Sequence, residues 1–381
     1  MILFFQLLFW ASFFLCLATY FIYPVIVWLI SKMRPLKIST KEYFPDVSII
    51  ISAFNEENSI TEKIRNTLAQ DYPSDKIEII VGSDGSTDRT VEFAKMVEDP
   101  RVKVFDLKDN EGKTAVQNYC VDHSMGEILL FTDAASFISP NAIKEMVKNF
   151  ADQRIGCVAG FMRFINTDRN ITTESQGLYW KYEAKLRELE SNLGHLIGVD
   201  GPLYAIRRND YKKLGNNIIS DFISPLLVIA NGKRVVLEKE AYVDEVPTNA
   251  SDHEIRTRRR ITSRGLIGLK THAELLNIFK YPALSLQIYF HKVVRWFVGP
   301  LVFLNFIAAI FLSQFLFYKL VLLGYFIFFM SALMGMGLDK LKLRIKLFSI
   351  PYYFTLVNYA AILGIIDFFN NRQAITWEPV R

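Results

Sequence analysis

The first 31 residues of the chain contain no charged side chain, and this segment constrains the fold more than any other. It is too long for the apolar core of a signal peptide, and a bilayer crossing needs only about 20 residues. Basic residues follow it directly, at Lys32, Arg34, Lys37 and Lys41. Because positive charge is enriched on the cytoplasmic side of membrane helices, we predict a retained transmembrane helix over residues 1–31, followed by cytoplasmic chain.

Three more uncharged runs lie near the carboxyl end, over residues 296–318, 320–338 and 347–366. Each approaches the length of a membrane span, although the last run also suits an interfacial or re-entrant segment. The loop between the last two runs is predicted to be cytoplasmic because of its basic residues Lys340, Lys342, Arg344 and Lys346. Residues 281–295 mix aromatic and basic side chains, which predicts a segment along the membrane surface. We therefore expect a multi-pass protein of the cell membrane, with C-terminal transmembrane helices over 296–369 and a tail over 370–381.

Residues 42–280 have the composition of a water-exposed α/β domain. Four apolar, β-compatible runs alternate with helical spacing, and these runs are residues 47–52, 77–81, 102–105 and 128–131. Each run is followed by an acidic or glycine-rich turn and then a helix, which predicts βαβ units and a parallel sheet. The predicted fold class is therefore α/β, with a cytoplasmic domain over 42–280. The three cysteines lie far apart, which indicates a reducing compartment and no disulfide framework.

Candidate ligand-binding residues follow three of these strands. They are Ala53 with the polar residues Asn55 and Glu56 after the first strand, Asp84 after the second, and Asp133 after the fourth. The carboxyl ends of parallel strands meet at the edge where open α/β sheets bind their ligands. A lone aspartate at a strand end is more often a turn cap, so the inference depends on finding several of them. The sequence therefore predicts a ligand site at this edge of the sheet.

The segment 112–114, Gly-Lys-Thr, resembles the end of a phosphate-binding loop. The first glycine of such a loop is missing, which excludes a Walker-type nucleotide triphosphatase. The net charge of +5 is modest and is concentrated in three basic clusters. We predict contact with a lipid bilayer and no nucleic-acid partner.

Two downstream segments also carry candidate chemistry. Asp221 precedes a helical stretch, so it is either a helix cap or a general base. Residues 256–264 contain five arginines, which are Arg256, Arg258, Arg259, Arg260 and Arg264. Guanidinium forks match the oxygens of a departing diphosphate, and the alternative is a juxtamembrane patch that attracts anionic lipid.

The segments 52–57, 84–88 and 132–133, taken in order, resemble those of the family 2 inverting glycosyltransferases, which have the nucleotide-sugar A-type fold. The nearest group is the membrane-bound processive polysaccharide synthases, which include the cellulose, hyaluronan, chitin-oligosaccharide and poly-N-acetylglucosamine synthases. Residues 198–208 resemble the acceptor-side segment of that group, and residues 375–381 resemble the tails of one bacterial branch. The resemblance covers nearly the whole chain.

This resemblance implies a role for each candidate residue. Asp221 would be the general base for the acceptor hydroxyl, and Asp133 would hold a Mg²⁺ or Mn²⁺ ion. The nucleotide-sugar donor, expected to carry UDP, would contact Ala53, Asn55, Glu56, Asp84, Lys113, Asp133 and Arg260. The acceptor, a glycan or a lipid-linked sugar, would contact Asp200, Gly201 and Ser220. The diphosphate would also be stabilised by Arg256, Arg258, Arg259 and Arg264.

Three positions depart from the pattern of the family. Ala135 replaces the second aspartate of the metal motif Asp-x-Asp, which leaves fewer protein ligands for the ion. Ser220 precedes Asp221 where the family has Thr-Glu-Asp or similar, and Ile261 stands where a tryptophan is expected. None of these changes removes the carboxylate that the chemistry needs.

Three functions remain open from the sequence. The first is a processive synthase that elongates a β-linked polysaccharide and helps to export it, with accessory export or modifying proteins as possible partners. The second is a transferase that adds one sugar to a lipid carrier, and the third is a non-catalytic membrane subunit that retains the fold. Product length separates the first two, and donor-dependent nucleotide release excludes the third.

Overall fold

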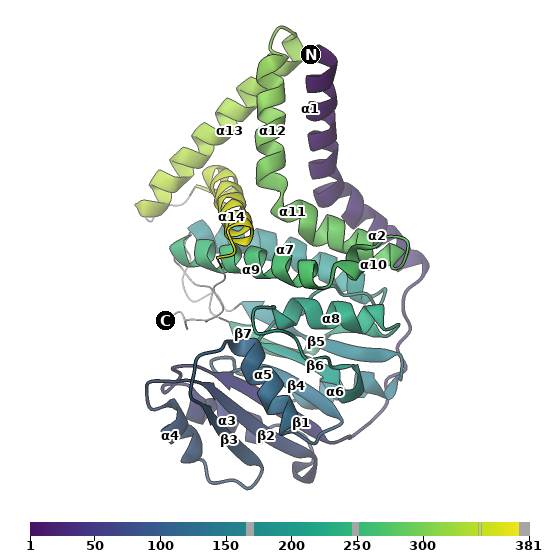
Figure 1. Ribbon diagram of the computed structural model, residues 1–381, viewed down its shortest axis with the longest axis vertical. Helices are drawn as coiled ribbons and strands as arrows, with labels where there is room; N and C mark the ends of the chain where they lie inside the picture. Colours follow the sequence, from purple (N-terminus) through teal and green to yellow (C-terminus); the bar gives the residue numbers. More distant parts are fainter. Residues whose placement is uncertain (165–170, 246–250, 342, 344, 373–381) are drawn as a thin grey trace.

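The computed structural model describes residues 1–164, 171–245, 251–341, 343 and 345–372 (Figure 1). Within these residues lies one seven-stranded sheet, with the strand order β3-β2-β1-β4-β6-β5-β7. The strands are β1 (Val47–Ala53), β2 (Ile77–Asp84), β3 (Val102–Leu107), β4 (Ile128–Asp133), β5 (Ile155–Phe164), β6 (Leu203–Arg207) and β7 (Arg234–Glu245). The predicted α/β class and the four predicted strands are confirmed.

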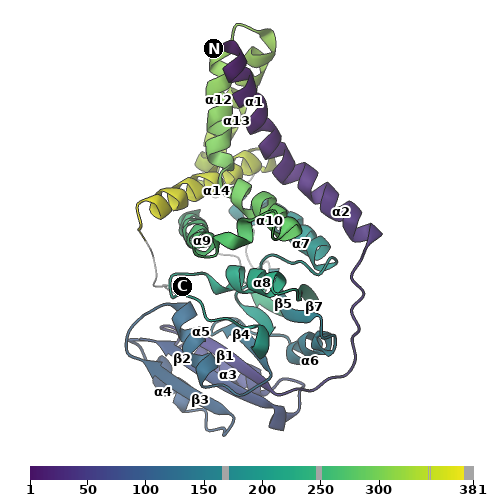
Figure 2. The same ribbon diagram turned by 45° about the vertical axis from the view of Figure 1, so that its right-hand side comes forward.

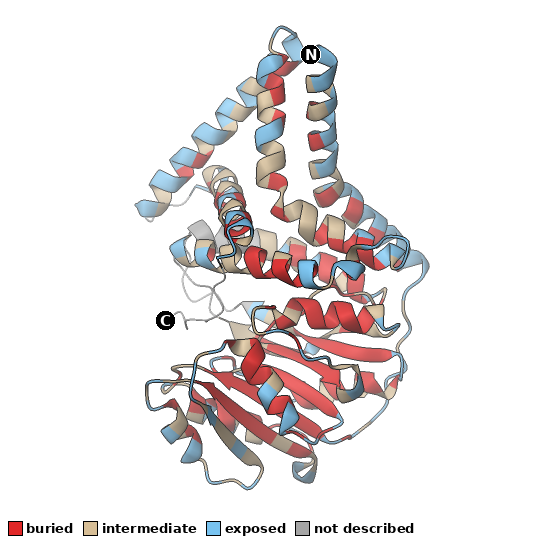
Figure 3. Cartoon of the chain, in the orientation of Figure 1, coloured by how far each residue is buried: buried red, intermediate tan, exposed pale blue. Residues whose placement is uncertain are grey.

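The sheet is parallel from β3 through β2 and β1 to β4, as the sequence predicts. Strand β6 differs, because it is antiparallel to both β4 and β5. Strand β1 lies in the middle of the parallel part and is buried along its whole length (Figure 3). An apolar run buried on both faces is what a central strand of a parallel sheet requires.

Helices cover both faces of the sheet (Figure 1). One face packs on α3 (Ile60–Leu68), α4 (Thr90–Lys95) and α6 (Ala142–Val147). The other face packs on α5 (Lys113–Asp122) and α8 (Ser220–Ala230). Helix α5 lies so close to β2 that a Cβ at Gly82 would meet Val116 Cγ1 at 2.5 Å, so glycine permits this contact.

The membrane part begins with α1 (Ile2–Leu17), a π-helical turn (Ala18–Ile22) and α2 (Tyr23–Met33). These segments form one apolar helix of 32 residues, long enough to cross a bilayer. The π turn lies just before Pro24, whose missing N–H removes a hydrogen bond from the α-helical ladder. Two more helices are long and apolar enough to cross a bilayer, and they are α13 (Leu316–Lys340) and α14, which spans Lys346–Phe369.

The uncharged run over residues 296–318 is not one continuous helix, and its crossing of a membrane stays a prediction. Helix α12 (Val298–Phe311) stops before the polar residues Ser313 and Gln314, and α13 begins at Leu316. Helix α12 is preceded by α10 (Pro282–Ile288), a π turn (Tyr289–Val293) and α11 (Val294–Trp296), and it bends by 65° from this segment. The bent pair has the length and composition of either a broken span or a re-entrant loop.

Helix α14 runs across the molecule rather than along α1 and α12 (Figure 2). It packs on α9 (Ser251–Thr271) and on α7 (Ile171–Ser191). Tyr353 of α14 donates to Glu254 Oε1 of α9 at 2.8 Å, and Ser251 donates to Asp339 Oδ2 of α13 at 2.8 Å. Helix α9 is therefore held by two membrane helices. Lys342, Arg344 and the predicted tail motif over 375–381 lie outside the described residues.

A buried ionic cluster joins α7 to the membrane segments. The two ring nitrogens of His291 contact Glu190 Oε1 at 2.6 Å and Glu183 Oε1 at 2.8 Å. Arg295 donates to Glu183 Oε2 at 2.6 Å, and the hydroxyl of Tyr23 donates to Glu190. Charges buried in this way must be paired, so the cluster fixes α7 against α2 and the π turn that follows α10.

Candidate active site

The carboxyl ends of β1, β2 and β4 lie side by side because these strands are parallel and in register. Ser52 pairs with Gly82 on one side and with Asp133 on the other. This register brings the predicted residues Ala53, Asp84 and Asp133 to one edge of the sheet. The edge is the place where an open α/β sheet binds its ligand.

Lys113 joins two of the predicted segments. It is the first residue of α5, and the turn before it contains Gly112 with a φ of 96°, which favours glycine. Its ammonium group forms an ion pair with Asp133 Oδ1 and donates to the carbonyl oxygen of Gly201 at 3.3 Å. Lys113 therefore connects the end of β4 to the loop before β6.

Asp221 faces the same loop from the first turn of α8. A Cβ atom at Gly201 would lie 2.7 Å from Asp221 Oδ2 and 3.2 Å from Lys113 Nζ. The N-cap residue of α8 is Ile219, so Asp221 is not the cap. The structure thus gathers Lys113, Asp133, Gly201 and Asp221 from four separate segments of the chain.

The environment of Asp221 suits a proton acceptor. Burial raises the pKa of this carboxyl above its ordinary value, and the charges of Asp133 and Asp200 raise it further, whereas Lys113 and Arg264 lower it. A higher pKa makes a carboxylate a stronger base, and the two cations favour its ionised form.

The donor-side loops are tied to one another. Asn55, with a φ of 53°, accepts a hydrogen bond from the Thr87 N–H at 2.8 Å, and the Glu56 N–H donates to Thr90 Oγ1 at 2.7 Å. Asp84 is fully buried and accepts from the N–H of Gly112 at 3.0 Å. Its carboxylate therefore organises the turn before α5, and its contact with a donor stays a prediction.

The predicted acceptor residues differ in their surroundings. Asp200 forms a partly buried ion pair with Arg187 NH1 at 2.5 Å. The hydroxyl of Ser220 donates to Gln117 Oε1 at 2.6 Å and points into the core. Their contacts with an acceptor stay predictions, and Gly201 is the member of the set that touches Asp221 and Lys113.

The five arginines of α9 divide into two groups. Arg258 pairs with Glu254 at 2.8 Å, and Arg259 pairs with Asp367 of α14. Arg264 donates to the carbonyl oxygen of Ile218 at 2.9 Å, and burial lowers the pKa of its guanidinium to about 10. Three of the arginines thus have partners inside the protein. For Arg256 and Arg260 the described residues provide no ion pair, so these two fit best the predicted role at a diphosphate.

Comparison with known proteins relates most of this site to a known family. Residues 48–215, less than half of the chain, match the glycosyl transferase family 2. This part of the chain therefore resembles that family. The matched residues include β1 to β6 and the segments with Asp133, Lys113 and Gly201, whereas Asp221 and α9 follow them.

Known relatives resemble the glycosyltransferase domain at modest identity. A hyaluronan synthase of Streptococcus pyogenes is 27% identical over 187 residues, which cover 46% of this chain and 43% of that protein. An N-acetylglucosaminyltransferase of Azorhizobium caulinodans is 29% identical over 170 residues, 43% of this chain and 43% of that protein. The aligned part is therefore less than half the length of these relatives.

One solved structure has the same fold over most of the chain. It is a mannosyltransferase from Pyrobaculum calidifontis, in complex with GDP-Man and Mn²⁺. The two structures superpose with a TM-score of 0.68 over 96% of this chain and 100% of that one, at 21% sequence identity. The glycosyltransferase A-type fold is thereby confirmed.

Two residues that the sequence analysis did not select lie beneath this edge. Lys63 of α3 is fully buried and donates to Thr132 Oγ1 at 2.8 Å and to the carbonyl oxygen of Ser136. Glu245, the last residue of β7, accepts from Ser136 Oγ at 2.8 Å. Lys63 falls on the apolar stripe of α3 with Ile60, Ile64 and Thr67, and this spacing was the available sign that it points inward.

A divalent cation would find few protein ligands here. The described residues contain no group of three His, Cys, Asp or Glu side chains arranged around one point. Asp133 provides a carboxylate at the strand end, and Glu245 brings a second one close to it, since their charges interact. Mg²⁺ and Mn²⁺ are often held by one or two carboxylates, with phosphate oxygens and water as the other ligands. The residues present fit an ion of this kind when a diphosphate is bound.

Proposed function

We propose that the chain is a membrane glycosyltransferase that transfers a sugar, with inversion, from a nucleotide sugar to a growing β-linked glycan. The observation that carries the proposal is the convergence of Lys113, Asp133, Gly201 and Asp221 at the carboxyl ends of the parallel strands. A base, a cation-binding carboxylate and a fixed ammonium group within one site match the demands of this reaction.

The residues divide the reaction among them. Asp221 would take the proton from the acceptor hydroxyl, which attacks the anomeric carbon while the bond to the diphosphate breaks on the opposite face. Lys113 and Arg260 would stabilise the negative charge on the departing diphosphate. A divalent ion held by Asp133, with Glu245 nearby, would supply further charge neutralisation. Gly201 lets the loop before β6 lie close to Lys113 and Asp221, because a Cβ atom at this position would crowd both side chains.

Elongation of a polysaccharide is supported by the resemblance to a hyaluronan synthase. One observation favours a second candidate, transfer of a single sugar to a lipid-linked acceptor. The seam between α1 and α12 is filled, because Phe5 stacks on Phe311 at 4.2 Å and Asn305 donates to the Phe9 carbonyl at 2.8 Å. A polymer could not pass along this seam without separating the two helices.

Membranes containing the chain are incubated with a panel of UDP- and GDP-sugars, and the released nucleoside diphosphate and the size of the product are measured. Donor-dependent release that is lost in Asp221→Asn supports the proposal. A long product indicates a synthase, and a product extended by one sugar indicates the second candidate. If the protein folds and binds nucleotide but releases no diphosphate with any donor, the proposal is wrong and the chain is a non-catalytic subunit.

A further inference from the structure

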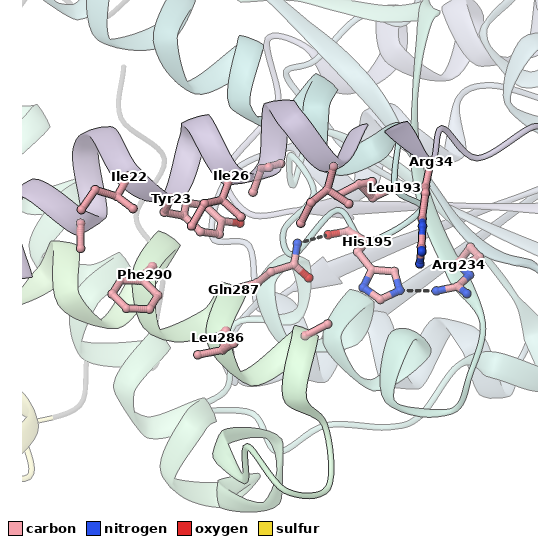
Figure 4. Close-up of a pocket in the computed structure, with 14 residues that line it drawn as sticks. Ile22, Tyr23, Ile26, Arg34, Leu193, His195, Arg234, Leu286, Gln287 and Phe290 are labelled. Atoms are coloured by element: carbon pink, nitrogen blue, oxygen red, sulfur yellow. Dashed lines mark hydrogen bonds between the residues drawn. The ribbon is translucent and has the colours of Figure 1, made fainter. Parts of the chain in front are cut away.

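A cavity of about 620 Å³ lies between α2 and the segment that contains α10 (Figure 4). Aliphatic and aromatic side chains form its walls, with Ile22 and Ile26 on α2 and with Leu286 and Phe290 on the opposite side. Both walls belong to apolar segments next to the predicted membrane surface. The occupant of the cavity therefore has an apolar part.

One end of the cavity is basic. Arg34, at the end of α2, and Arg234, at the start of β7, lie there together with His195 (Figure 4). Arg234 donates to His195 Nε2, and burial together with the charge of Arg234 lowers the pKa of the histidine, so the ring is neutral. Within the described part of the chain, neither arginine forms an ion pair with a carboxylate. Two positive charges thus face this end without a protein counter-ion.

Gln287 provides a further polar group in the wall. Its amide nitrogen donates to the carbonyl oxygen of His195 at 3.2 Å, and its side chain is only 7% exposed. Its amide oxygen has no hydrogen-bond donor among the described residues.

The length of the cavity also fits a lipid. Its wall extends along the first helix from Ala18 to Arg34, which is about 24 Å at 1.5 Å per residue. One leaflet contributes about half of the ~30 Å hydrocarbon core, with a headgroup layer beyond it. An acyl chain and its headgroup would therefore both be accommodated.

We propose that this cavity binds one anionic phospholipid, with its phosphate between Arg34 and Arg234 and one acyl chain along α2. Guanidinium groups bind phosphate oxygens with paired hydrogen bonds, and two arginines match a headgroup that keeps a net negative charge. The proposal does not depend on the sugar-transfer reaction or on the side of the membrane on which the cavity lies.

This lipid is distinct from a lipid-linked acceptor. Arg234 begins β7 and Glu245 ends it, and Glu245 lies beside Ser136 at the edge that holds Asp133. Eleven residue steps along a strand span roughly 35 Å. A phosphate held by Arg234 therefore lies far from the place where a donor sugar would react.

The test uses the purified full-length protein and native mass spectrometry, with phosphatidylglycerol or phosphatidylcholine added in detergent. The variant Arg34→Gln/Arg234→Gln removes both charges of the site. The control Lys37→Gln/Lys41→Gln removes two charges from exposed residues of the same juxtamembrane segment that do not line the cavity. Ala283→Phe, at an exposed position of the cavity wall, fills the apolar part and leaves the charges in place.

We expect the wild type to retain one phosphatidylglycerol and to prefer it over phosphatidylcholine. The arginine variant should bind it about 30-fold more weakly, from the usual contribution of each basic residue at a lipid surface. Ala283→Phe should also lose the lipid, and the lysine control should keep it. Equal retention by the arginine variant, or an equal loss in the lysine control, would overturn the proposal. A polyprenyl phosphate that displaces phosphatidylglycerol and accepts the sugar would show that the cavity is an acceptor site instead. The melting temperature of each variant shows whether it is folded. If the arginine variant does not fold, loss of the lipid in Ala283→Phe still tests the proposal.

Discussion

Replacing Gly201 by alanine tests whether sugar transfer depends on the position of Asp221 beside the loop before β6. The added methyl group would lie 2.7 Å from Asp221 Oδ2 and 3.2 Å from Lys113 Nζ, both closer than ordinary van der Waals contact at 3.4 Å. The carboxylate must therefore retreat by about 0.7 Å or rotate, and Lys113 by less. The base would then be displaced from the acceptor hydroxyl while the donor edge keeps its structure.

The size of the effect follows from this displacement. Moving a catalytic group by about 1 Å commonly costs about 100-fold in rate. For Gly201→Ala we expect kcat to fall by between about 10-fold and 100-fold, or about 1.4 to 2.7 kcal/mol of transition-state stabilisation. The KM for the nucleotide sugar should change little, because the methyl group does not reach the donor loops.

Gly198→Ala is the matched control in the same loop. A Cβ there would approach Lys292 no closer than 3.8 Å, which is an ordinary contact. The assay is nucleoside diphosphate release at varied donor concentration, with the thermal unfolding midpoint of each variant. If Gly201→Ala is as active as Gly198→Ala, then Asp221 is not the base.

Three further predictions concern the base, the buried lysine and the metal. Asp221→Asn keeps the shape of the side chain and removes its basicity, so transfer should fall at least ~100-fold while nucleotide binding, measured by calorimetry, survives. Burial lowers the pKa of Lys63 from 10.5 to about 7, so the unfolded chain binds one more proton than the native protein between these values. Between pH 10.5 and about 7, the free energy of unfolding should therefore decrease as the pH falls, by about 1.4 kcal/mol per pH unit. Above pH 10.5 this loss is absent. In Lys63→Met the melting temperature should not show this pH dependence. Asp133→Ala should abolish nucleotide-dependent Mn²⁺ binding, which is measured by electron paramagnetic resonance. Ala135→Asp, at an exposed position, should strengthen this binding. Unchanged Mn²⁺ binding by Asp133→Ala would exclude Asp133 as a ligand.

The sequence was sufficient to predict the parallel part of the sheet. Continuous apolar runs such as the one in β4 have one stable environment, the middle of a sheet covered on both faces. Polar residues that follow these runs then meet at one edge, which is why Asp84 and Asp133 could be placed there from the sequence. The antiparallel strand β6 was not predicted, because strand direction depends on how a long connection returns to the sheet.

Partners of charged side chains were harder to predict than their positions. The sequence shows five arginines in α9, but it does not show that Asp367 lies opposite Arg259 or that Glu254 binds Arg258. These contacts join residues on neighbouring helices or residues one turn apart. From the sequence alone, each arginine has several carboxylates with which it could pair. Glu245 is a similar case, since only the folded sheet brings the end of β7 next to Ser136.

The contacts between α9 and the membrane helices bear on the boundary predicted near residue 280. Asp339 and Tyr353 bind the first turns of α9, and Asp367 binds its middle, so the partners of this helix come from beyond that boundary. The same helix donates from Arg264 to the chain just before Asp221. A fragment cut at residue 280 would separate Arg259 from Asp367 and would remove the hydrogen bonds of Tyr353 and Asp339 to α9. In thermodynamic terms the water-exposed and bilayer-embedded parts form one cooperative unit, and we expect them to melt in a single transition.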